Sequence, residues 1–582
     1  MRLAIIEKEF CNPQACGNYL CARMCPLNRA GEDCILKENK PRINEDICNG
    51  CGICQAKCPF NAISIINLPG KLAEEPIHRY GTNMFELFRL PIPKKGAVVG
   101  IIGMNGIGKS TALAILSGNL NPNIGNTKTS VGKPEIIKKY PHIALGAYFK
   151  ALFAGKVSIA YKPQRIDLLP QIQKGKVSEF LKKIDKIIID ELGLYSLSNK
   201  NIEEISGGEL QKLAIAATAS KKAELYFFDE PMSFLDVTTR IKTAKLIRSL
   251  AVNSAVVVVE HDLAVLDYIS DEIQIIYGKP GCYGIASQSK AVNRGINEYL
   301  GGYLAEDNMR FRSYEIKFAK SPEKRAVAPV LLNFPELEKS FPGFLLKVNS
   351  GSIHKSEVLA VMGANGLGKT TFLKLLAGLE KPDKGVIERI KIAYKQQYPV
   401  SVDGKVIDWL KNTAGADFST GWYKSMIEKL GLNRVLNQEI KNLSGGELQK
   451  VYIAITLSQD VQFYAFDEPS AFIDVEDRLK IAEVIKEFVR RKDRAAIVVD
   501  HDVQFIDYIG DSMLVFEGTP GEQGFVYGPC NKREGMNRVL KMLNITYRKD
   551  IETNRAKINK PDSVLDREQR AKGEFYYTDV AV

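Results

Sequence analysis

The stretch that decides the fold is SGGELQK, residues 206–212, because the same seven residues return unchanged at 444–450. Around each copy the chain repeats further motifs in the same order. These motifs are GMNGIGKS (103–110) and GANGLGKT (363–370), FDEP at 228–231 and 466–469, and EHD (260–262) with DHD (500–502). An ordered repeat on this scale indicates two homologous modules in one chain.

Each glycine motif follows a β-rich apolar run and precedes a helical one, which predicts a strand, a glycine loop and a helix. The pattern GxxxxGK[ST] lets backbone N–H groups wrap phosphates at a helix N-terminus. Its lysine reaches the outer phosphates, and its hydroxyl, from Ser110 or Thr370, ligates magnesium. We expect ATP to contact Asn105, Gly106, Gly108, Lys109, Ser110 and Thr111, and likewise Asn365, Gly366, Gly368, Lys369, Thr370 and Thr371.

The FDEP motifs end apolar runs, LYFFDE and FYAFDE, in paired carboxylates. We expect the aspartates to hold the magnesium shell and the glutamates to polarise the attacking water. The chain has only five histidines, yet one follows an apolar strand late in each module, which predicts a γ-phosphate sensor. The predicted residues are Asp229, Glu230 and His261 in the first module and Asp467, Glu468 and His501 in the second.

Cysteines are concentrated at the start of the chain, where nine of the eleven fall within the first 58 residues. In a reducing compartment this indicates metal rather than disulfides. CNGCGICQAKCP (48–59) matches the ligand run of bacterial-type ferredoxins, in which the fourth cysteine reaches a second [4Fe–4S] cube. An irregular run lies upstream and ends in Cys25–Pro26.

In bacterial-type ferredoxins, each cysteine run gives three ligands to one cube and its fourth cysteine to the other cube. The same arrangement here predicts two cubes, with Cys34 left over or replacing one ligand. Zinc is the competing metal, although eight suitably arranged thiolates fit two cubes better. The predicted sets are Cys25, Cys48, Cys51 and Cys54 for one cube, and Cys11, Cys16, Cys21 and Cys58 for the other.

Length and composition set the broad class. A chain of 582 residues is too long to fold around one hydrophobic core. Its content of 45% hydrophobic and 25% charged residues is ordinary for a soluble protein. The net charge of +12 weakly favours polyanionic partners. No apolar run is long enough to span a membrane and no secretory signal is visible, so we expect a cytoplasmic protein.

The repeat also predicts where the modules differ and how the chain is divided. Gln164 lies 61 positions after Gly103, but Gln397 lies only 34 after Gly363, so the first module carries about 27 extra residues within about 123–159. This insertion is either a solvated elaboration or a docking element.

The polar connector after the first module and the similar segment after the second are expected to lie together at the seam. We expect an iron–sulfur domain (1–75), a first ATPase domain (76–300), a hinge (301–329), a second ATPase domain (330–545) and a C-terminal hinge and tail (546–582).

SGGELQK, with the glycine loops, the late histidines and the glutamines of YKPQ and YKQQ, closely resembles the signature of ATP-binding-cassette (ABC) ATPases. In that family the phosphate loop of one cassette faces the signature of the other. The resemblance therefore implies that Ser444, Gly445 and Gly446 cap the ATP on Lys109, and that Ser206, Gly207 and Gly208 cap the ATP on Lys369. It also implies magnesium contacts for Gln164 and Gln397, and adenine contacts for Phe85 and Phe344.

The whole chain, including NGIGKST, GELQK, NMRFR and LNITYRKD, resembles the E subfamily of ABC proteins, the RNase L inhibitor-like ribosome-recycling ATPases. That resemblance implies an α/β fold with two tandem head-to-tail ABC domains and a small α+β two-cluster ferredoxin-like domain. It implies ATP or ADP, Mg²⁺ and two [4Fe–4S] clusters as cofactors, and a monomer whose cassettes pair within the chain. The implied partners are the small ribosomal subunit and its RNA, a release factor or Pelota-like rescue factor, and initiation factors, with Arg310 and Arg312 contacting RNA.

Two other functions fit the same motifs. A soluble ATPase subunit of a transporter would need a membrane partner and would co-purify with it. An ATP-gated iron–sulfur electron donor would require redox-active clusters whose potential responds to ATP, yet no flavin or dinucleotide motif is evident.

Overall fold

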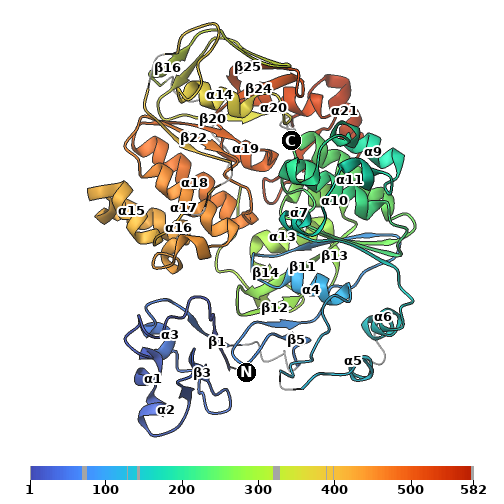
Figure 1. Cartoon of the computed structure of the whole chain (residues 1–582), viewed down its shortest axis with the longest axis vertical. Helices are drawn as coiled ribbons and strands as arrows, with labels where there is room; N and C mark the ends of the chain where they lie inside the picture. Colours follow the sequence, from blue (N-terminus) through green and yellow to red (C-terminus); the bar gives the residue numbers. More distant parts are fainter. Residues whose placement is uncertain are drawn as a thin grey trace.

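The computed structural model describes residues 2–67, 75–127, 129–140, 144–318, 328–387, 390–397, 399–400 and 402–577. Parts of the expected hinge (319–327) and of the expected insertion (128 and 141–143) lie outside these residues. The chain forms a small N-terminal lobe and two larger α/β bodies (Figure 1). We call the larger bodies the first and second cassettes.

The N-terminal lobe has short helices and two small antiparallel sheets, β1–β4 and β2–β3. Its core combines a few aliphatic side chains, such as Ile6 and Ile63, with buried cysteines. A core this small depends on additional cross-links, which clusters would supply. The elements are β1 (Arg2–Ile6), α1 (Leu20–Met24), α2 (Pro26–Arg29), β2 (Ile35–Leu36), β3 (Arg42–Ile43), α3 (Ile53–Lys57) and β4 (Ile63–Asn67).

The first cassette is built on a mixed sheet of order β5-β6-β12-β11-β7-β10-β9-β8, with β13 paired to β11. Its central strands are parallel and apolar throughout, as strands covered on both faces must be. The strands are β5 (His78–Arg79), β6 (Glu86–Phe88), β7 (Val98–Ile102), β8 (Ile159–Lys162), β9 (Leu225–Asp229), β10 (Ala255–Val259), β11 (Glu272–Lys279), β12 (Tyr283–Ala286) and β13 (Lys290–Ala291).

Helices cover the sheet, and the 27-residue difference between the modules corresponds to α5 and α6, which pack on each other at the edge of the first cassette (Figure 1). The helices are α4 (Lys109–Leu116), α5 (Lys133–Lys139), α6 (Ala144–Phe153), α7 (Leu169–Ile172), α8 (Val177–Leu181), α9 (Lys186–Leu192), α10 (Gly207–Ala219), α11 (Val237–Leu250), α12 (Leu263–Ile269) and α13 (Val292–Gly301). Short 3-10 helices are η1 (Ile166–Leu168), η2 (Leu194–Leu197) and η3 (Ile202–Glu204).

The second cassette repeats this strand order as β17-β18-β25-β24-β20-β23-β22-β21, so the predicted pair of α/β modules is confirmed. The strands are β16 (Val330–Phe334), β17 (Leu337–Phe341), β18 (Phe344–Val348), β19 (Gly351–His354), β20 (Val358–Met362), β21 (Ile392–Lys395), β22 (Phe463–Asp467), β23 (Ala495–Val499), β24 (Ser512–Thr519) and β25 (Gln523–Asn531). The helices are α14 (Lys369–Leu376), α15 (Val406–Ala414), η4 (Gly415–Ser419), α16 (Gly421–Lys429), η5 (Leu432–Arg434), η6 (Ile440–Asn442), α17 (Gly445–Leu457), α18 (Val475–Arg491), α19 (Val503–Ile509) and α20 (Lys532–Met542).

The connector and the C-terminal segment meet at the seam between the cassettes, as expected from the sequence. Asn554 Nδ2 donates to the Phe318 carbonyl at 2.9 Å, and the fully buried Arg555 lies 3.2 Å from Asp267 of the first cassette. The chain thus returns to its first cassette after completing the second. The elements are β14 (Tyr303–Leu304), β15 (Met309–Arg310), β26 (Tyr547–Lys549), β27 (Ala556–Ile558) and α21 (Val564–Lys572).

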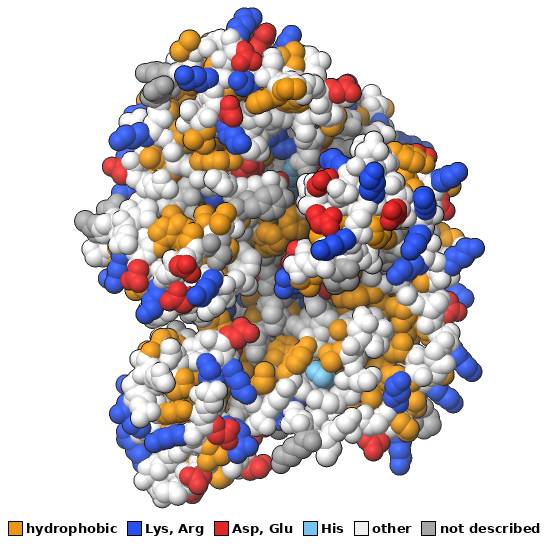
Figure 2. Space-filling model, viewed as in Figure 1, with side chains coloured by type: hydrophobic (Ala, Val, Ile, Leu, Met, Phe, Trp, Pro, Cys, Tyr) orange, Lys and Arg blue, Asp and Glu red, His pale blue; other side chains and the backbone are white. Residues whose placement is uncertain are grey.

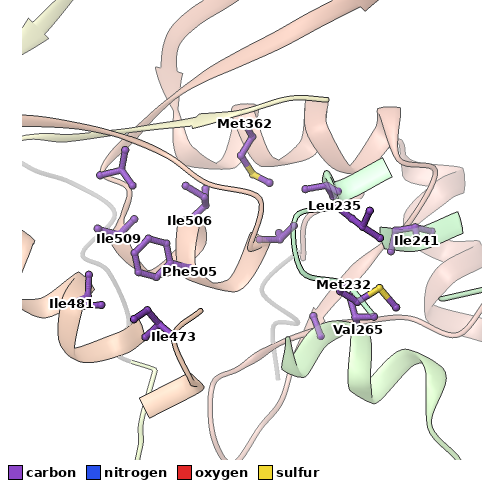
Figure 3. Close-up of a cluster of buried hydrophobic side chains, with 14 of the residues drawn as sticks. Met232, Leu235, Ile241, Val265, Met362, Ile473, Ile481, Phe505, Ile506 and Ile509 are labelled. Carbon is purple, nitrogen blue, oxygen red and sulfur yellow. The ribbon is translucent and has the colours of Figure 1, made fainter. Parts of the chain in front are cut away.

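Apolar side chains from both cassettes form one continuous buried cluster across the seam. Met232 and Leu235 of the first cassette and Ile473 and Phe505 of the second all belong to it (Figure 3). Because Met232, Leu235 and Ile473 follow the FDEP motifs closely in the chain, this cluster packs the two ATP-binding regions against each other.

Candidate functional site

A cavity of about 510 Å³ lies between the cassettes, at the second glycine loop. The first cassette contributes Ser206 and Gly208 from the start of its signature helix α10, together with Phe234. The second cassette contributes Phe344, Asn365, Gly366, Gly368, Lys369, Thr370, Thr371, Gln397, Asp467, Glu468 and Gly521. The structure therefore brings the first signature to the second phosphate loop, in the head-to-tail arrangement that the sequence predicts.

The two phosphate loops have the same geometry. Lys109 Nζ donates to the carbonyls of Gly103 and Met104 at 2.9 and 2.8 Å, and Lys369 makes the equivalent bonds. The last loop glycine has φ 96° in the first loop and 88° in the second, a region that favours glycine. A Cβ at Gly108 would also lie 2.6 Å from Phe85 Cζ, so the loop needs glycine for two reasons.

Each phosphate loop also contacts the segment after the FDEP motif of the other cassette. Asn365 N–H donates to Asp236 Oδ2 at 2.9 Å, and Asn105 N–H donates to Asp474 Oδ2 at 3.2 Å. The Asn105 side chain donates to the Phe472 carbonyl at 3.3 Å. These contacts connect the two halves at both ATP sites.

The predicted catalytic groups converge on the two glutamates. Gln164 Nε2 donates to Glu230 Oε1 at 2.8 Å, and His261 Nε2 lies 3.4 Å from the same oxygen. The second cassette repeats this, with Gln397 at 2.7 Å from Glu468 Oε1 and His501 at 3.4 Å. The structure places each glutamine on the glutamate, while the predicted glutamine contact with magnesium remains a prediction.

Electrostatics keep both glutamates ionised. Burial alone would raise the pKa of Glu230, but the neighbouring His261, Lys109 and Gln164 hold that pKa at about 2. The pKa of Glu468 is also about 2, for the same reasons with His501, Gln397 and Lys369. A carboxylate with so low a pKa can orient and polarise water, but it is a weak proton acceptor.

The aspartates that precede the glutamates suit magnesium. Burial and the neighbouring Glu230 raise the pKa of Asp229 to about 6. Both carboxylate oxygens of Asp229 are buried, and the nearby Ser110 hydroxyl and two lysines partly offset the rise in its pKa. In the second cassette, Asp467 Oδ2 accepts from the Thr370 hydroxyl at 3.0 Å and from the Tyr394 hydroxyl at 3.2 Å. Mg²⁺ prefers such oxygen donors, so these residues fit the ion.

A pH dependence of magnesium binding follows from Asp229. Because its pKa is raised to about 6, it is protonated below that pH and must lose a proton to bind the ion. We expect the first-site affinity for Mg·ATP to fall about tenfold per unit below about pH 6 and to level off above it. Titration of Mg²⁺ at several pH values checks this, with Asp229→Asn as the variant that should abolish the dependence; a flat profile in the unaltered chain would contradict it.

The two predicted adenine-binding aromatics lie under the phosphate loops. Phe344 lines the cavity, and Phe85 packs against Gly108. Sequence reasoning missed Tyr80, which is 51% exposed beside Phe85 and whose hydroxyl lies 3.1 Å from the Thr111 hydroxyl. Tyr80 thus presents a further aromatic face at the first site.

Several cysteines of the N-terminal lobe lie close together, and their assignment to two crossed ligand sets stays a prediction. Cys11, Cys16, Cys21 and Cys58 line one pocket together with Tyr19, Leu20 and Phe60. The thiols of Cys48 and Cys51 lie near Cys54 and contribute, after burial, to raising its pKa to about 12. The buried Cys34 lies beside Cys25 and Cys48, and burial and these neighbours raise its pKa.

In the described part of the chain, no three His, Cys, Asp or Glu side chains are close enough to share one metal ion. Four thiols, those of Cys11, Cys16, Cys21 and Cys58, line one pocket, which is the donor type and number that a [4Fe–4S] cluster takes. These residues therefore fit one of the predicted clusters.

The lobe contacts both cassettes. Asn83 of the first cassette is 1% exposed; its Oδ1 accepts from Ile43 N–H at 2.8 Å, and its Nδ2 donates to the Ala4 carbonyl at 3.1 Å. On the other side, the Arg434 guanidinium of the second cassette lies over the Phe10 ring, 5.9 Å from its centroid. A change in the distance between the cassettes would therefore alter at least one of these contacts of the lobe.

Replacing Asn83 by Ala is expected to loosen the lobe, because it leaves the buried Ile43 N–H and Ala4 carbonyl unpaired at a cost of about 1–3 kcal/mol each. Hydrogen exchange in residues 2–67 should rise while the ATPase rate stays within about twofold. Asn119→Ala, which removes an exposed asparagine, is the matched control. Equal exchange in the two variants would contradict this docking role.

One expectation about the connector is wrong. Arg312 was expected to contact RNA, but it is 7% exposed. Its guanidinium donates to the Leu300 and Tyr299 carbonyls and pairs with Glu476 of the second cassette at 3.2 Å. It belongs to the seam, whereas Arg310 is exposed.

Comparison with known proteins agrees with this geometry. A family model described as ABC transporter matches residues 92–233 and again 346–471. A model described as possible Fer4-like domain in RNase L inhibitor matches residues 1–33, and one described as 4Fe-4S binding domain matches residues 41–64. An uncharacterized ABC transporter ATP-binding protein of Methanocaldococcus jannaschii is 48% identical, over 100% of this chain and 98% of its own. ABC transporter E family member 1 of Arabidopsis thaliana is 38% identical over 99% of both chains. Translation initiation factor RLI1 of Saccharomyces cerevisiae is 39% identical over 99% of this chain and 98% of its own.

Solved structures give the same result. A structure described as a model of ribosome-bound archaeal Pelota and ABCE1 matches with a TM-score of 0.94, at 46% identity and over 99% of both chains. A second, the complex of archaeal ribosomal stalk protein aP1 and the archaeal ribosome recycling factor aABCE1, matches with a TM-score of 0.82 at 46% identity over 87% of this chain and 100% of that one. Within the described ranges, no helix has the length and apolar character needed to cross a membrane. The chain therefore belongs to the ABC E family, the RNase L inhibitor family, as an ABC-type ATPase with an N-terminal [4Fe–4S] region.

Proposed function

We propose that this protein is a cytoplasmic ribosome-recycling factor that uses ATP to separate ribosomal subunits after termination or rescue. The observation that carries the proposal is the match over 99% of both chains to an archaeal relative described as ribosome-bound with Pelota. The composite cavity between the cassettes and the lobe that touches both of them support a machine that converts ATP binding into movement.

At each ATP site the chain's own residues perform five tasks. The loop lysine and the backbone N–H groups bind phosphate, and the signature of the other cassette covers it. The aspartate and the loop hydroxyl hold Mg²⁺, which supplies charge neutralisation when bound. The glutamate orients water, and the histidine is placed to contact the γ-phosphate; in the first cassette, burial and Lys109 lower the pKa of His261.

The mechanical step follows from the contacts of the lobe. Asn83 fastens it to the first cassette, and Phe10 meets Arg434 of the second. A change in the distance between the cassettes therefore strains one contact or the other and moves the lobe. In this proposal the lobe is residues 1–75, the cassettes are 76–300 and 330–545, and the segments 301–329 and 546–582 act as hinges.

Ribosomal RNA and a release factor or Pelota-like factor are the proposed partners. Several Lys and Arg side chains lie on the visible face of the N-terminal lobe (Figure 2). Such charges suit phosphate backbones and make binding depend on salt.

Sedimentation with purified ribosomal subunits tests the function. With a non-hydrolysable ATP analogue we expect the protein to co-sediment with the small subunit, and with ATP and a Pelota-like factor we expect assembled ribosomes to separate. Assembled ribosomes that stay intact under all these conditions would refute the proposal.

A further inference from the structure

The backbone of each catalytic glutamate is strained. Glu230 has φ 47° and Glu468 has φ 45°, in the left-handed region that side chains other than glycine rarely adopt. The strain occurs at the same place in both cassettes. Such conformations persist only where surrounding contacts enforce them, and they concentrate at functional sites.

A buried lysine supports each strained backbone. Lys162 Nζ donates to the carbonyls of Asp229 and Glu230 at 2.9 and 3.2 Å. Lys395 Nζ repeats these bonds to Asp467 and Glu468 at 2.8 and 3.3 Å. Both lysines are 1% exposed at the ends of β8 and β21. Burying an ammonium group costs free energy unless hydrogen bonds compensate it, and here the backbone carbonyls accept those bonds. Burial lowers the pKa of both lysines to about 8.

A buried glutamine from the signature helix reaches the same backbone. Gln211 Nε2 donates to the carbonyls of Glu230 and Pro231, at 2.9 Å in each case. In the second cassette, Gln449 Nε2 donates to the Glu468 carbonyl at 3.2 Å. Gln211 is 1% exposed and Gln449 is fully buried.

The signature helix therefore connects two ATP sites. Its first turn, with Ser206 and Gly208, lines the cavity at the second phosphate loop. One turn later, Gln211 holds the glutamate that serves the first phosphate loop. The same helix therefore contacts the second ATP site at its first turn and the Glu230 carbonyl through Gln211.

We infer that Lys162 and Gln211, and equally Lys395 and Gln449, are positioning residues for hydrolysis that hold the catalytic glutamates in their left-handed backbone conformation. The inference rests on the proposed catalytic role of Glu230 and Glu468. It adds residues that do not touch nucleotide to the set that determines kcat.

The test measures kcat, KM for ATP and melting temperature for two double variants, Lys162→Met/Lys395→Met and Gln211→Met/Gln449→Met. We expect kcat to fall about tenfold or more, since buried carbonyls on a strained backbone lose their donors. KM should stay within about twofold, because none of these side chains binds ATP. Thr218→Val/Thr456→Val is the matched control, since these threonines lie on the same helices and bond only to their own helix.

The outcomes separate the possible explanations. If the lysine variant does not fold, the glutamine variant decides, because it changes no buried charge. A kcat within twofold of the unaltered chain, or a fall that the threonine control shares, overturns the inference. If Glu230→Gln/Glu468→Gln remains active, the catalytic assignment itself fails; if that variant is inactive while the lysine and glutamine variants retain full kcat, only the positioning role fails.

Discussion

Replacing Glu230 and Glu468 together by glutamine is expected to lower ATP hydrolysis at least about a hundredfold while leaving ATP bound. Glutamine keeps the size of the side chain but removes the charge that orients the attacking water. The loop lysines and the opposing signatures are untouched, so the cassettes should remain closed around ATP. Single-turnover hydrolysis and retention of labelled ATP after gel filtration measure the two effects.

Glu487→Gln is a suitable control because Glu487 is an exposed glutamate that pairs only with Lys429 on the surface. Its kcat should remain within about twofold, as surface ion pairs contribute little. A double glutamate variant that turns over ATP as fast as this control would show that another group orients the water.

Substituting one predicted cluster ligand in each set should have the second large effect. Cys54→Ser and Cys21→Ser are each expected to lower the iron content from about eight to about four atoms per chain. The lobe has a small core, so loss of a cluster should also unfold part of it. Iron analysis, visible absorption and proteolysis of residues 1–75 are the measurements, and ATP hydrolysis by the cassettes should persist.

Cys530→Ser is the matched control, since Cys530 lies in the second cassette next to the Met513 carbonyl. Its iron content should equal that of the unaltered chain. The same comparison tests Cys34: if Cys34→Ser loses a cluster and Cys25→Ser does not, the ligand assignment changes by one residue. Retention of both clusters in Cys54→Ser would show that Cys54 is not a required ligand.

The sequence predicted the parts of the ATP sites that local chemistry specifies. Phosphate loops, strand-end carboxylates and late histidines each need a particular residue type at a particular spacing, and the internal repeat showed every one of them twice. The pairing of Ser206 with the loop of Lys369 came from family resemblance, and the cavity between the cassettes agrees with it.

Long-range burial could not be predicted. Lys162 lies in an alternating stretch, IAYKPQ, where a lysine normally faces solvent, and only the fold places the Asp229 carbonyl above it. The sequence could not show that Arg312 is buried, because its partner, Glu476, is far away in the chain. No sequence signal marked Asn83, whose side chain fastens a separate domain. One signal was present for Lys162 and Gln211, since both recur at equivalent positions of the repeat.

The return of the C-terminal segment to the first cassette bears on how the protein is made. Asp267 belongs to a helix of the first cassette, yet its buried partner Arg555 is synthesised 288 residues later. Until then that corner of the first cassette has an unpaired carboxylate and an uncovered apolar edge. Completion of this corner of the first cassette therefore depends on a segment that follows the whole second cassette in the chain.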